Sequence, residues 1–323
     1  MKAVKITSLG GRDVLAVSEV PTPTPQTGQV LIRVCISGIN FIDVYYREGK
    51  YKTPLPFILG GEGSGHIAAV GEGVEGVAEG DAVAWYGPLG SCAEYAVVDA
   101  RMVVKVPADV PLPTAAALMM QGVTAHYLAY STFPLKRGNT ALIHAAAGGV
   151  GNLLTQMAKA IGAEVFATAS SQEKAEIAKA SGADHVILYN QVDFDVAVRE
   201  LTHGVGVDVV YDGVGKTTFE QSLKSLKPLG MLALYGAASG PVPLFDLSRL
   251  STMGSLFITR PMSFDYIKPH SKYVERTDAL FTMYQDHDLN VRIDTIFPIE
   301  QVAEAYELLE SRRSKGKVLL SLE

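Results

Sequence analysis

The chain has 323 residues, of which 48% are hydrophobic and 19% charged, and its formal net charge is −6. This length suggests about two domains with sizeable cores, and the acidic balance gives no electrostatic footprint for binding nucleic acid. We expect no secretion signal and no membrane span, because no apolar run is long enough for either. The two cysteines cannot build a disulfide framework. These features predict a soluble, cytoplasmic protein.

The first 120 residues predict short strands separated by turns rich in glycine and proline. Strands are expected at residues 3–6, 15–20, 30–37, 65–70, 82–85, 93–97 and 103–106. Only residues 41–48 and 113–120 have a helical pattern. Many short strands with little helix indicate a compact β barrel or sandwich.

A strand, a glycine turn and a helix are expected between residues 138 and 161. The turn contains Ala145, Gly148 and Gly151, so alanine replaces the first glycine of the usual dinucleotide-binding fingerprint. Such a turn aims unpaired backbone N–H groups and the helix dipole at an anion, usually a pyrophosphate. The alternative is that a glycine-rich helix start only allows close packing against the strand.

The same alternation continues to residue 259. Strands are expected at residues 164–168, 185–189, 207–211, 231–235 and 256–259, and helices at 172–180, 196–202 and 219–226. Strands that alternate with helices imply right-handed crossovers and a parallel sheet, with ligands at the carboxyl ends of its strands. The sequence therefore predicts a Rossmann domain, which is an α/β fold with a doubly wound parallel sheet.

The residues after the second strand of this domain indicate which dinucleotide binds. An NAD-selective site usually has an acidic residue about 20 positions past the glycine turn, but here Ser170, Ser171 and Lys174 follow. Hydroxyls and an ammonium suit a 2′-phosphate, so we expect NADPH rather than NADH. The alternative is that Ser170 caps the helix and Lys174 is solvated, and both can hold together.

Residues 264–323 do not continue the Rossmann pattern. They predict helices at 272–284 and 299–311 and a final strand at 316–322, which we expect to return to the first domain. The strand from Ser255 to Thr259 would lie at the edge of the Rossmann sheet. An uncovered apolar edge tends to pair, so a homodimer is expected there, and a tetramer stays open.

Several motifs resemble the zinc-free NADPH:quinone oxidoreductases, the zeta-crystallin group of the medium-chain dehydrogenase/reductase superfamily. They are residues 38–45 (GINFIDVY), Tyr51, residues 144–151 (HAAAGGVG), residues 209–215 (VVYDGVG), residues 259–261 (TRP) and residues 310–312 (ESR). The resemblance covers essentially the whole chain. It implies a GroES-like β-barrel catalytic domain over residues 1–122, a Rossmann domain over 123–262 and a return segment over 263–323.

Zinc-dependent members of that superfamily carry cysteine and histidine ligands where this chain has Asn40, Gly61 and Gln121. None of these three is a zinc ligand, since zinc takes thiolate, imidazole or carboxylate. His66 lies nearby in sequence, but without partners it is expected to be structural. We therefore expect no metal site.

The resemblance also implies the residues that contact substrate and cofactor. Asn40, Tyr45 and Tyr51 would line the acceptor pocket, although the spacing of the tyrosines alone equally predicts ordinary aromatic packing. Ser170, Lys174, Tyr189 and Arg312 would hold the 2′-phosphate, although Arg312 alone suits a solvated helix end and Tyr189 strand-end packing. The remaining expected cofactor contacts are Phe41, Thr124, Tyr127, Gly148, Gly149, Val150, Gly213, Gly236, Ala237, Ala238, Phe257 and Thr259.

Without zinc to stabilise an alkoxide, the expected chemistry is hydride transfer to an acceptor that is already electron-poor. A quinone fits, since hydrogen bonds and positioning suffice to assist its reduction. A reductase of 2-alkenals or enoyl thioesters is an alternative on the same scaffold. A protein of another class, which binds NADPH without turnover, is the third hypothesis.

Overall fold

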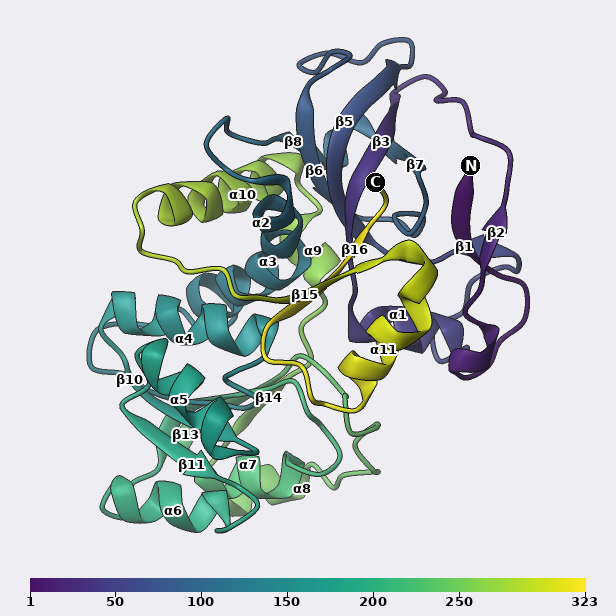
Figure 1. Cartoon of the computed structure of the whole chain (residues 1–323). Helices are drawn as coiled ribbons and strands as arrows, with labels where there is room; N and C mark the ends of the chain where they lie inside the picture. Colours follow the sequence, from purple (N-terminus) through teal and green to yellow (C-terminus); the bar gives the residue numbers. More distant parts are fainter. The chain divides into compact units, whose positions relative to one another are not determined.

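The computed structural model describes all 323 residues, which divide into two compact units. The first unit comprises residues 1–120, 270–285 and 291–323, and the second comprises residues 121–269 and 286–290. The second unit thus extends past the expected limit of residue 262 and takes in a short piece of the C-terminal segment. Both chain ends belong to the first unit (Figure 1).

The second unit is built on a six-stranded parallel sheet whose strand order is β11-β10-β9-β12-β13-β14. The Rossmann prediction is therefore confirmed, and β14 lies at one edge as expected. β10 is buried at every position after its first, which is typical of strands covered on both faces. The strands are β9 (Thr140–Ile143), β10 (Glu164–Ala169), β11 (His185–Leu188), β12 (Val207–Asp212), β13 (Leu226–Leu234) and β14 (Phe257–Thr259).

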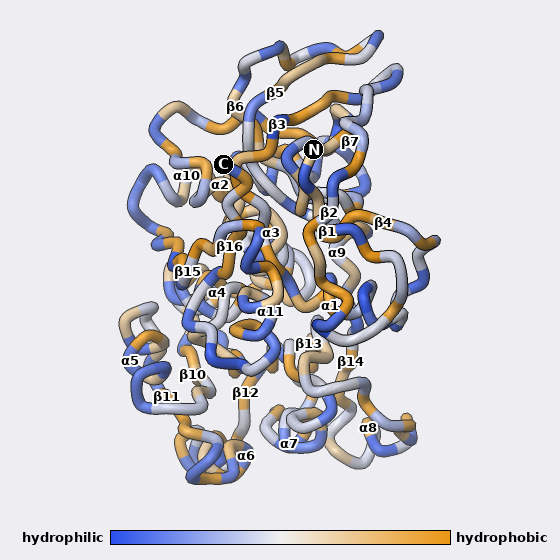
Figure 2. The backbone as a smooth tube through the Cα atoms, turned by 45° about the vertical axis from the view of Figure 1, so that its right-hand side comes forward, coloured by the Kyte–Doolittle hydropathy of each residue, from blue (hydrophilic) through white to orange (hydrophobic).

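The helices of the second unit follow the strands with small shifts from the expected limits. The helix after the glycine turn begins at Gly149, three residues earlier than predicted, and ends at Ile161, followed by the C-cap Gly162, whose φ of +93° suits glycine. Figure 2 shows hydrophobic and hydrophilic residues mixed along α6, as expected for a helix with one buried face. The helices are α3 (Met120–Tyr127), α4 (Gly149–Ile161), α5 (Gln172–Ala180), α6 (Phe194–Leu201), α7 (Phe219–Ser225), α8 (Ser248–Thr252) and α9 (Ser263–Ile267), with a π-helical turn over Leu128–Thr132.

The first unit contains two sheets. One has the strand order β2-β1-β4, and the other has the order β15-β16-β3-β5-β6-β8, with β7 paired to β3. The strands are β1 (Lys2–Ile6), β2 (Val17–Glu19), β3 (Gln29–Gly38), β4 (Phe57–Ile58), β5 (Glu62–Val70), β6 (Ala82–Tyr86), β7 (Tyr95–Asp99), β8 (Val103–Lys105), β15 (Ile293–Pro298) and β16 (Lys317–Ser321). The strands enclose a core that includes Val30, Ile32, Val83 and Trp85.

The helices of this unit come from both ends of the chain. They are α1 (Phe41–Arg47), α2 (Leu112–Leu118), α10 (His270–Gln285) and α11 (Val302–Glu310), with 3₁₀ turns at Arg12–Val14, Ala100–Met102 and Ile299–Gln301. The C-terminal strand β16 pairs antiparallel with β3, which belongs to the same unit (Figure 1). No helix in the structure is both long and apolar enough to span a membrane.

Candidate active site

The glycine turn between β9 and α4, which is expected to bind an anion, has a tightly constrained backbone. Ala145 adopts a positive φ of +51°, and its carbonyl oxygen accepts a hydrogen bond of 2.8 Å from the backbone N–H of Gly148. A Cβ atom at Gly151 would come within 2.4 Å of that carbonyl oxygen, so only glycine fits there. Gly148 is the N-cap of α4, and no side chain caps the helix. The first N–H groups of α4, including those of Gly149 and Val150, are therefore placed to bind an anion.

A buried relay joins this turn to two neighbouring strands. Ser222 donates to Asp212 (3.0 Å), so its oxygen accepts from His144 Nε2 (2.9 Å). The other ring nitrogen, Nδ1, then accepts from Thr168 (3.0 Å), whose oxygen accepts in turn from the Ala145 N–H (3.4 Å). Because each hydroxyl has only one proton, this series of hydrogen bonds defines a neutral His144 with its proton on Nε2.

The environment of His144 agrees with a neutral ring. Its side chain is buried, and burial lowers its pKa below the ordinary value, against the opposing influence of the Asp212 charge. The sequence reasoning did not identify this relay. Its signal in the sequence is the set of polar residues at the carboxyl ends of three strands, which ordinarily indicate contacts with a cofactor.

The residues expected to bind the 2′-phosphate belong to different units. Ser171, not Ser170, is the N-cap of α5 and accepts a hydrogen bond from the backbone N–H of Lys174 (3.3 Å). The capping alternative therefore named the wrong serine, and the Ser170 side chain does not cap the helix. Tyr189 follows β11 and bonds through its backbone N–H to Ala169 (3.3 Å), next to Ser170. Arg312, with a φ of +58°, follows α11 in the first unit.

The carboxyl ends of β12 and β13 approach each other closely at two glycines. A Cβ atom at Gly236 would lie 2.4 Å from the carbonyl oxygen of Gly213, and the backbone N–H of Ala238 donates to that same oxygen (3.2 Å). The turn after β12 is held by Asp212, which accepts from the backbone N–H groups of Val214 (2.8 Å) and Gly215 (2.9 Å). Ala237 follows Gly236, so the small residues expected near the ribose lie together at one end of the sheet.

The other expected cofactor contacts of the second unit lie on α3 and β14. Thr124 and Tyr127 are buried on α3, and Tyr127 is the last residue of that helix rather than one of its first. Tyr127 stacks on Tyr266, with ring centroids 4.3 Å apart. On the edge strand β14, Phe257 is 53% exposed and Thr259 is half-buried.

The residues expected to line the acceptor pocket lie on α1 or next to it in the first unit. Asn40 is the N-cap of α1, and Tyr45 lies on the helix. The ring of Tyr51 packs edge-on against Tyr45 and also against Tyr46, with centroid distances of 5.5 Å in both cases. The aromatic packing that the spacing predicts is therefore present. Tyr46 belongs to the same cluster, although the sequence reasoning did not include it.

Phe41 opens α1 and packs against the apolar core of the first unit. Asp43 also lies inside this unit, where it accepts hydrogen bonds from the backbone N–H of Asn40 (2.8 Å) and the hydroxyl of Tyr306 (3.0 Å). Burial raises the pKa of Asp43 to about 7, and these two hydrogen bonds oppose the rise.

The residues at the zinc positions of related dehydrogenases do not fit a zinc ion. Asn40 offers a carboxamide, which contacts the carboxylate of Glu62 and the ammonium of Lys317. Gly61 has no side chain, and the Gln121 carboxamide packs against Gly149. His66 contacts Cys35 (Sγ to Nδ1, 3.6 Å). No group of three histidine, cysteine or acidic side chains in the structure is arranged to hold a metal.

Comparison with known proteins agrees with this two-unit architecture. The alcohol dehydrogenase GroES-like domain matches residues 26–108, and the zinc-binding dehydrogenase domain matches residues 149–270. A quinone oxidoreductase of Pseudomonas aeruginosa is 40% identical over 321 residues, which cover 99% of both chains. The chain belongs to the quinone oxidoreductase family of the medium-chain dehydrogenase/reductases. The expected family and α/β fold class are therefore confirmed.

Two further relatives of this quinone oxidoreductase chain inform the choice of cofactor and acceptor. The crystal structure of Escherichia coli quinone oxidoreductase complexed with NADPH superposes with a TM-score of 0.97 at 35% identity, covering 99% of this chain and 100% of that one. A 2-haloacrylate reductase of Burkholderia sp. is 38% identical and covers 98% of each chain.

Proposed function

We propose that this quinone oxidoreductase family member uses NADPH to reduce quinones without the help of zinc. The observation that carries the proposal is the match of essentially the whole chain to quinone oxidoreductases, one of which is complexed with NADPH. The residues at the zinc positions support the proposal, since the Asn40 carboxamide can donate a hydrogen bond but does not hold a zinc ion that would act as a Lewis acid. Quinones suit such a site because their conjugated carbonyls accept a hydride without metal activation.

In the second unit, the N-terminus of α4 would bind the pyrophosphate through Gly148, Gly149 and Val150. Ser170, Lys174 and Tyr189 would hold the 2′-phosphate, and Arg312 of the first unit would add a second positive charge. The small residues at the carboxyl ends of β12 and β13 would let the ribose and nicotinamide approach the backbone. The remaining contacts proposed for the cofactor are Phe41, Thr124, Tyr127, Gly213, Gly236, Ala237, Ala238, Phe257 and Thr259.

When bound, NADPH supplies a hydride from its nicotinamide ring. The chain's own part is to hold the acceptor and to stabilise the negative charge that develops on its oxygen. Asn40, Tyr45 and Tyr51 would do so, since an amide N–H and two phenol hydroxyls are hydrogen-bond donors. Tyr51 is partly exposed at 36%, which leaves its ring accessible to an acceptor.

A second candidate function is the reduction of electron-poor double bonds, such as those of 2-alkenals, enoyl thioesters or 2-haloacrylates. The 38% identity to a 2-haloacrylate reductase favours this candidate. It needs the same cofactor and the same oxyanion donors, because hydride addition beside a carbonyl also produces an enolate.

The edge strand β14 supports the proposal of a homodimer. Its outer side pairs with no strand, and Phe257 is exposed there. A second copy would cover this edge by pairing β14 with itself around a two-fold axis.

We also propose the cytoplasm as the compartment, since thiols such as the free Cys35 and Cys92 stay reduced there.

Steady-state kinetics with NADPH test the proposed reaction. We expect kcat/KM to be highest with 1,4-benzoquinone or 9,10-phenanthrenequinone and lower with 2-hexenal and 2-chloroacrylate. A preference for the last two acceptors would establish the second candidate. Tight NADPH binding without turnover of any acceptor would show that the protein only binds the cofactor.

A further inference from the structure

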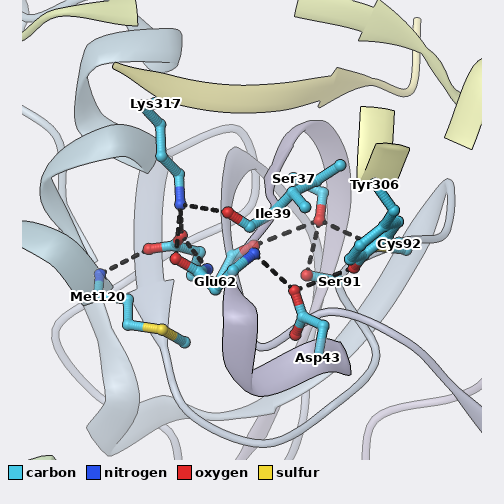
Figure 3. A network of polar contacts seen from close by, with 10 residues as sticks. Ser37, Ile39, Asp43, Glu62, Ser91, Cys92, Met120, Tyr306 and Lys317 are labelled. Carbon is cyan, nitrogen blue, oxygen red and sulfur yellow. Dashed lines mark hydrogen bonds and ion pairs between the residues drawn. The ribbon is translucent and has the colours of Figure 1, made fainter. Parts of the chain in front are cut away.

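A buried ion pair lies beside the proposed acceptor residue in the first unit. Glu62 is the first residue of β5 and Lys317 the first residue of β16, and their side chains are 0% and 1% exposed (Figure 3). Removing two charges from water costs free energy that their attraction repays only when the geometry and the additional hydrogen bonds are good. Such a pair is therefore weak evidence for stability and raises the question of what else it does.

The ammonium of Lys317 and both carboxylate oxygens of Glu62 form hydrogen bonds inside the protein. The Lys317 ammonium donates to the Glu62 carboxylate, to the carbonyl oxygen of Ile39 (3.0 Å) and to Oδ1 of Asn40 (2.9 Å). Glu62 Oε1 also accepts from Nδ2 of Asn40 (2.6 Å), and Oε2 accepts from the backbone N–H of Met120 (2.6 Å). The two ions are therefore held from several directions, and both contact the same carboxamide.

These contacts leave the Asn40 carboxamide only one orientation. An ammonium can only donate and a carboxylate can only accept, so Oδ1 must face Lys317 and Nδ2 must face Glu62. The amide cannot rotate by 180° without placing like groups against each other. The backbone of Asn40 is held as well, because its N–H donates to Asp43 (2.8 Å). One N–H of Nδ2 bonds to Glu62, and the second is left for another acceptor.

We propose that Glu62 and Lys317 are positioning residues that fix the Asn40 carboxamide so that its second N–H donates to the carbonyl oxygen of the acceptor. This inference rests on the proposed reductase function. Neither ion needs to contact the acceptor, since both act through Asn40. The role also explains why the C-terminal strand β16 returns to the first unit with a lysine at its start, where an apolar residue would suit a buried position.

Three variants separate this role from a purely structural one. Lys317→Met removes the ammonium at similar length, and Glu62→Gln/Lys317→Met removes both charges without leaving an unpaired ion. Arg47→Met is the matched control, because Arg47 is 1% exposed, pairs with Glu310 (2.8 Å) in the same unit and has no contact with Asn40. All three variants are expected to lower the melting temperature.

Kinetics with 1,4-benzoquinone give the first readout. We expect both variants that lack Lys317 to lose about 10- to 100-fold in kcat, while the dissociation constant for NADPH stays unchanged. Arg47→Met is expected to keep the wild-type kcat below its melting temperature. A wild-type kcat in Lys317→Met, with a loss of melting temperature like that of Arg47→Met, would overturn the proposal.

The side-chain amide spectrum gives a second readout that needs no turnover. The chain has five asparagines, so ¹⁵N-asparagine labelling yields five side-chain amide signals, and Asn40→Ala identifies the one from Asn40. We expect one strongly deshielded Asn40 amide proton from the Glu62 contact, and its return to the ordinary range in the double variant. An Asn40 signal that is the same in both proteins would overturn the positioning role. A normal wild-type spectrum without any quinone reduction would instead refute the proposed function on which the inference rests.

Discussion

Lys174 is the residue on which the choice between NADPH and NADH depends most directly. It lies in the first turn of α5, and β10 is followed by Ser170 and Ser171 rather than by an acidic residue. We predict that Lys174→Ala weakens NADPH binding about 10- to 100-fold, since a hydrogen bond to a charged group contributes about 1.5–3 kcal/mol. NADH binding should stay the same, because NADH has no 2′-phosphate.

Lys179→Ala is the control for this measurement, because Lys179 is an exposed lysine in the last turn of the same helix. Fluorescence titration of both variants with NADPH and NADH gives the four dissociation constants needed. An equal loss of affinity for the two cofactors in Lys174→Ala would contradict the 2′-phosphate assignment.

His144 is expected to make stability depend on pH. Its pKa is lowered in the folded protein by burial, so below pH of about 6.5 the unfolded chain binds a proton that the folded one does not. The free energy of unfolding should therefore fall as the pH drops below that value, by up to about 1.4 kcal/mol per pH unit. Asp43 acts in the opposite sense, because its raised pKa favours the folded state at low pH.

The difference between the wild type and His144→Gln isolates the histidine contribution from that of Asp43. Glutamine can donate and accept at the two positions of the relay but does not titrate. Urea unfolding between pH 5 and 8 should show a shallower decline in His144→Gln on the acidic side. Parallel curves for the two proteins would mean that His144 is not buried as a neutral group.

The sequence predicted many candidate residues but not the contacts that orient them. Lys174 was recognisable by its charge and its distance past the glycine turn, whereas Asn40 was predicted from the resemblance to the quinone oxidoreductases. Lys317 was not, because a lysine that begins a predicted strand ordinarily indicates a solvated end. Its partner Glu62 lies 255 positions away in the chain. The choice between Ser170 and Ser171 as the helix cap was likewise a matter of one residue that propensities cannot resolve.

The glycine turn before α4 is the element whose geometry matters most for the cofactor. A Cβ atom at Gly151 would lie 2.4 Å from the Ala145 carbonyl oxygen, whereas one at Gly148 would lie 3.2 Å from the same atom. We predict that Gly151→Ala lowers the free energy of unfolding by about 1–3 kcal/mol, because the backbone must shift to remove the overlap. Gly148→Ala is the matched control and should cost much less. Thermal unfolding without cofactor measures both, and equal losses would show that the turn has room at residue 151.

The elements were predicted well where the hydrophobic periodicity is strong. The central parallel strands are buried on both faces, so their apolar runs identify them, although β13 begins five residues before the expected start at residue 231. β15 was missed because it is an edge strand with only partly buried or exposed residues. Its sequence has neither a continuous apolar run nor a strict alternation, and only its pairing with β16 identifies it as a strand.

Association through β14 is the prediction that concerns the whole molecule. We predict that Phe257→Glu converts the dimer to monomers, because it places charges close to their symmetry mates along the proposed strand pair. Val196→Glu is the control, since Val196 on α6 is 52% exposed, much like Phe257 at 53%. Sedimentation velocity of the wild type and both variants gives the result. A wild type that sediments as a monomer, or a Phe257→Glu variant that stays dimeric, would contradict an interface at this edge.

A single-turnover experiment tests the proposed reaction most directly. Protein mixed with one equivalent of NADPH is reacted with excess 1,4-benzoquinone in a stopped-flow instrument, with NADH in parallel. We predict rapid oxidation of NADPH and oxidation at least about tenfold slower with NADH at concentrations that do not saturate the site. NADPH that stays reduced in the presence of the quinone, although bound by the protein, would contradict the assignment of this chain as a quinone reductase.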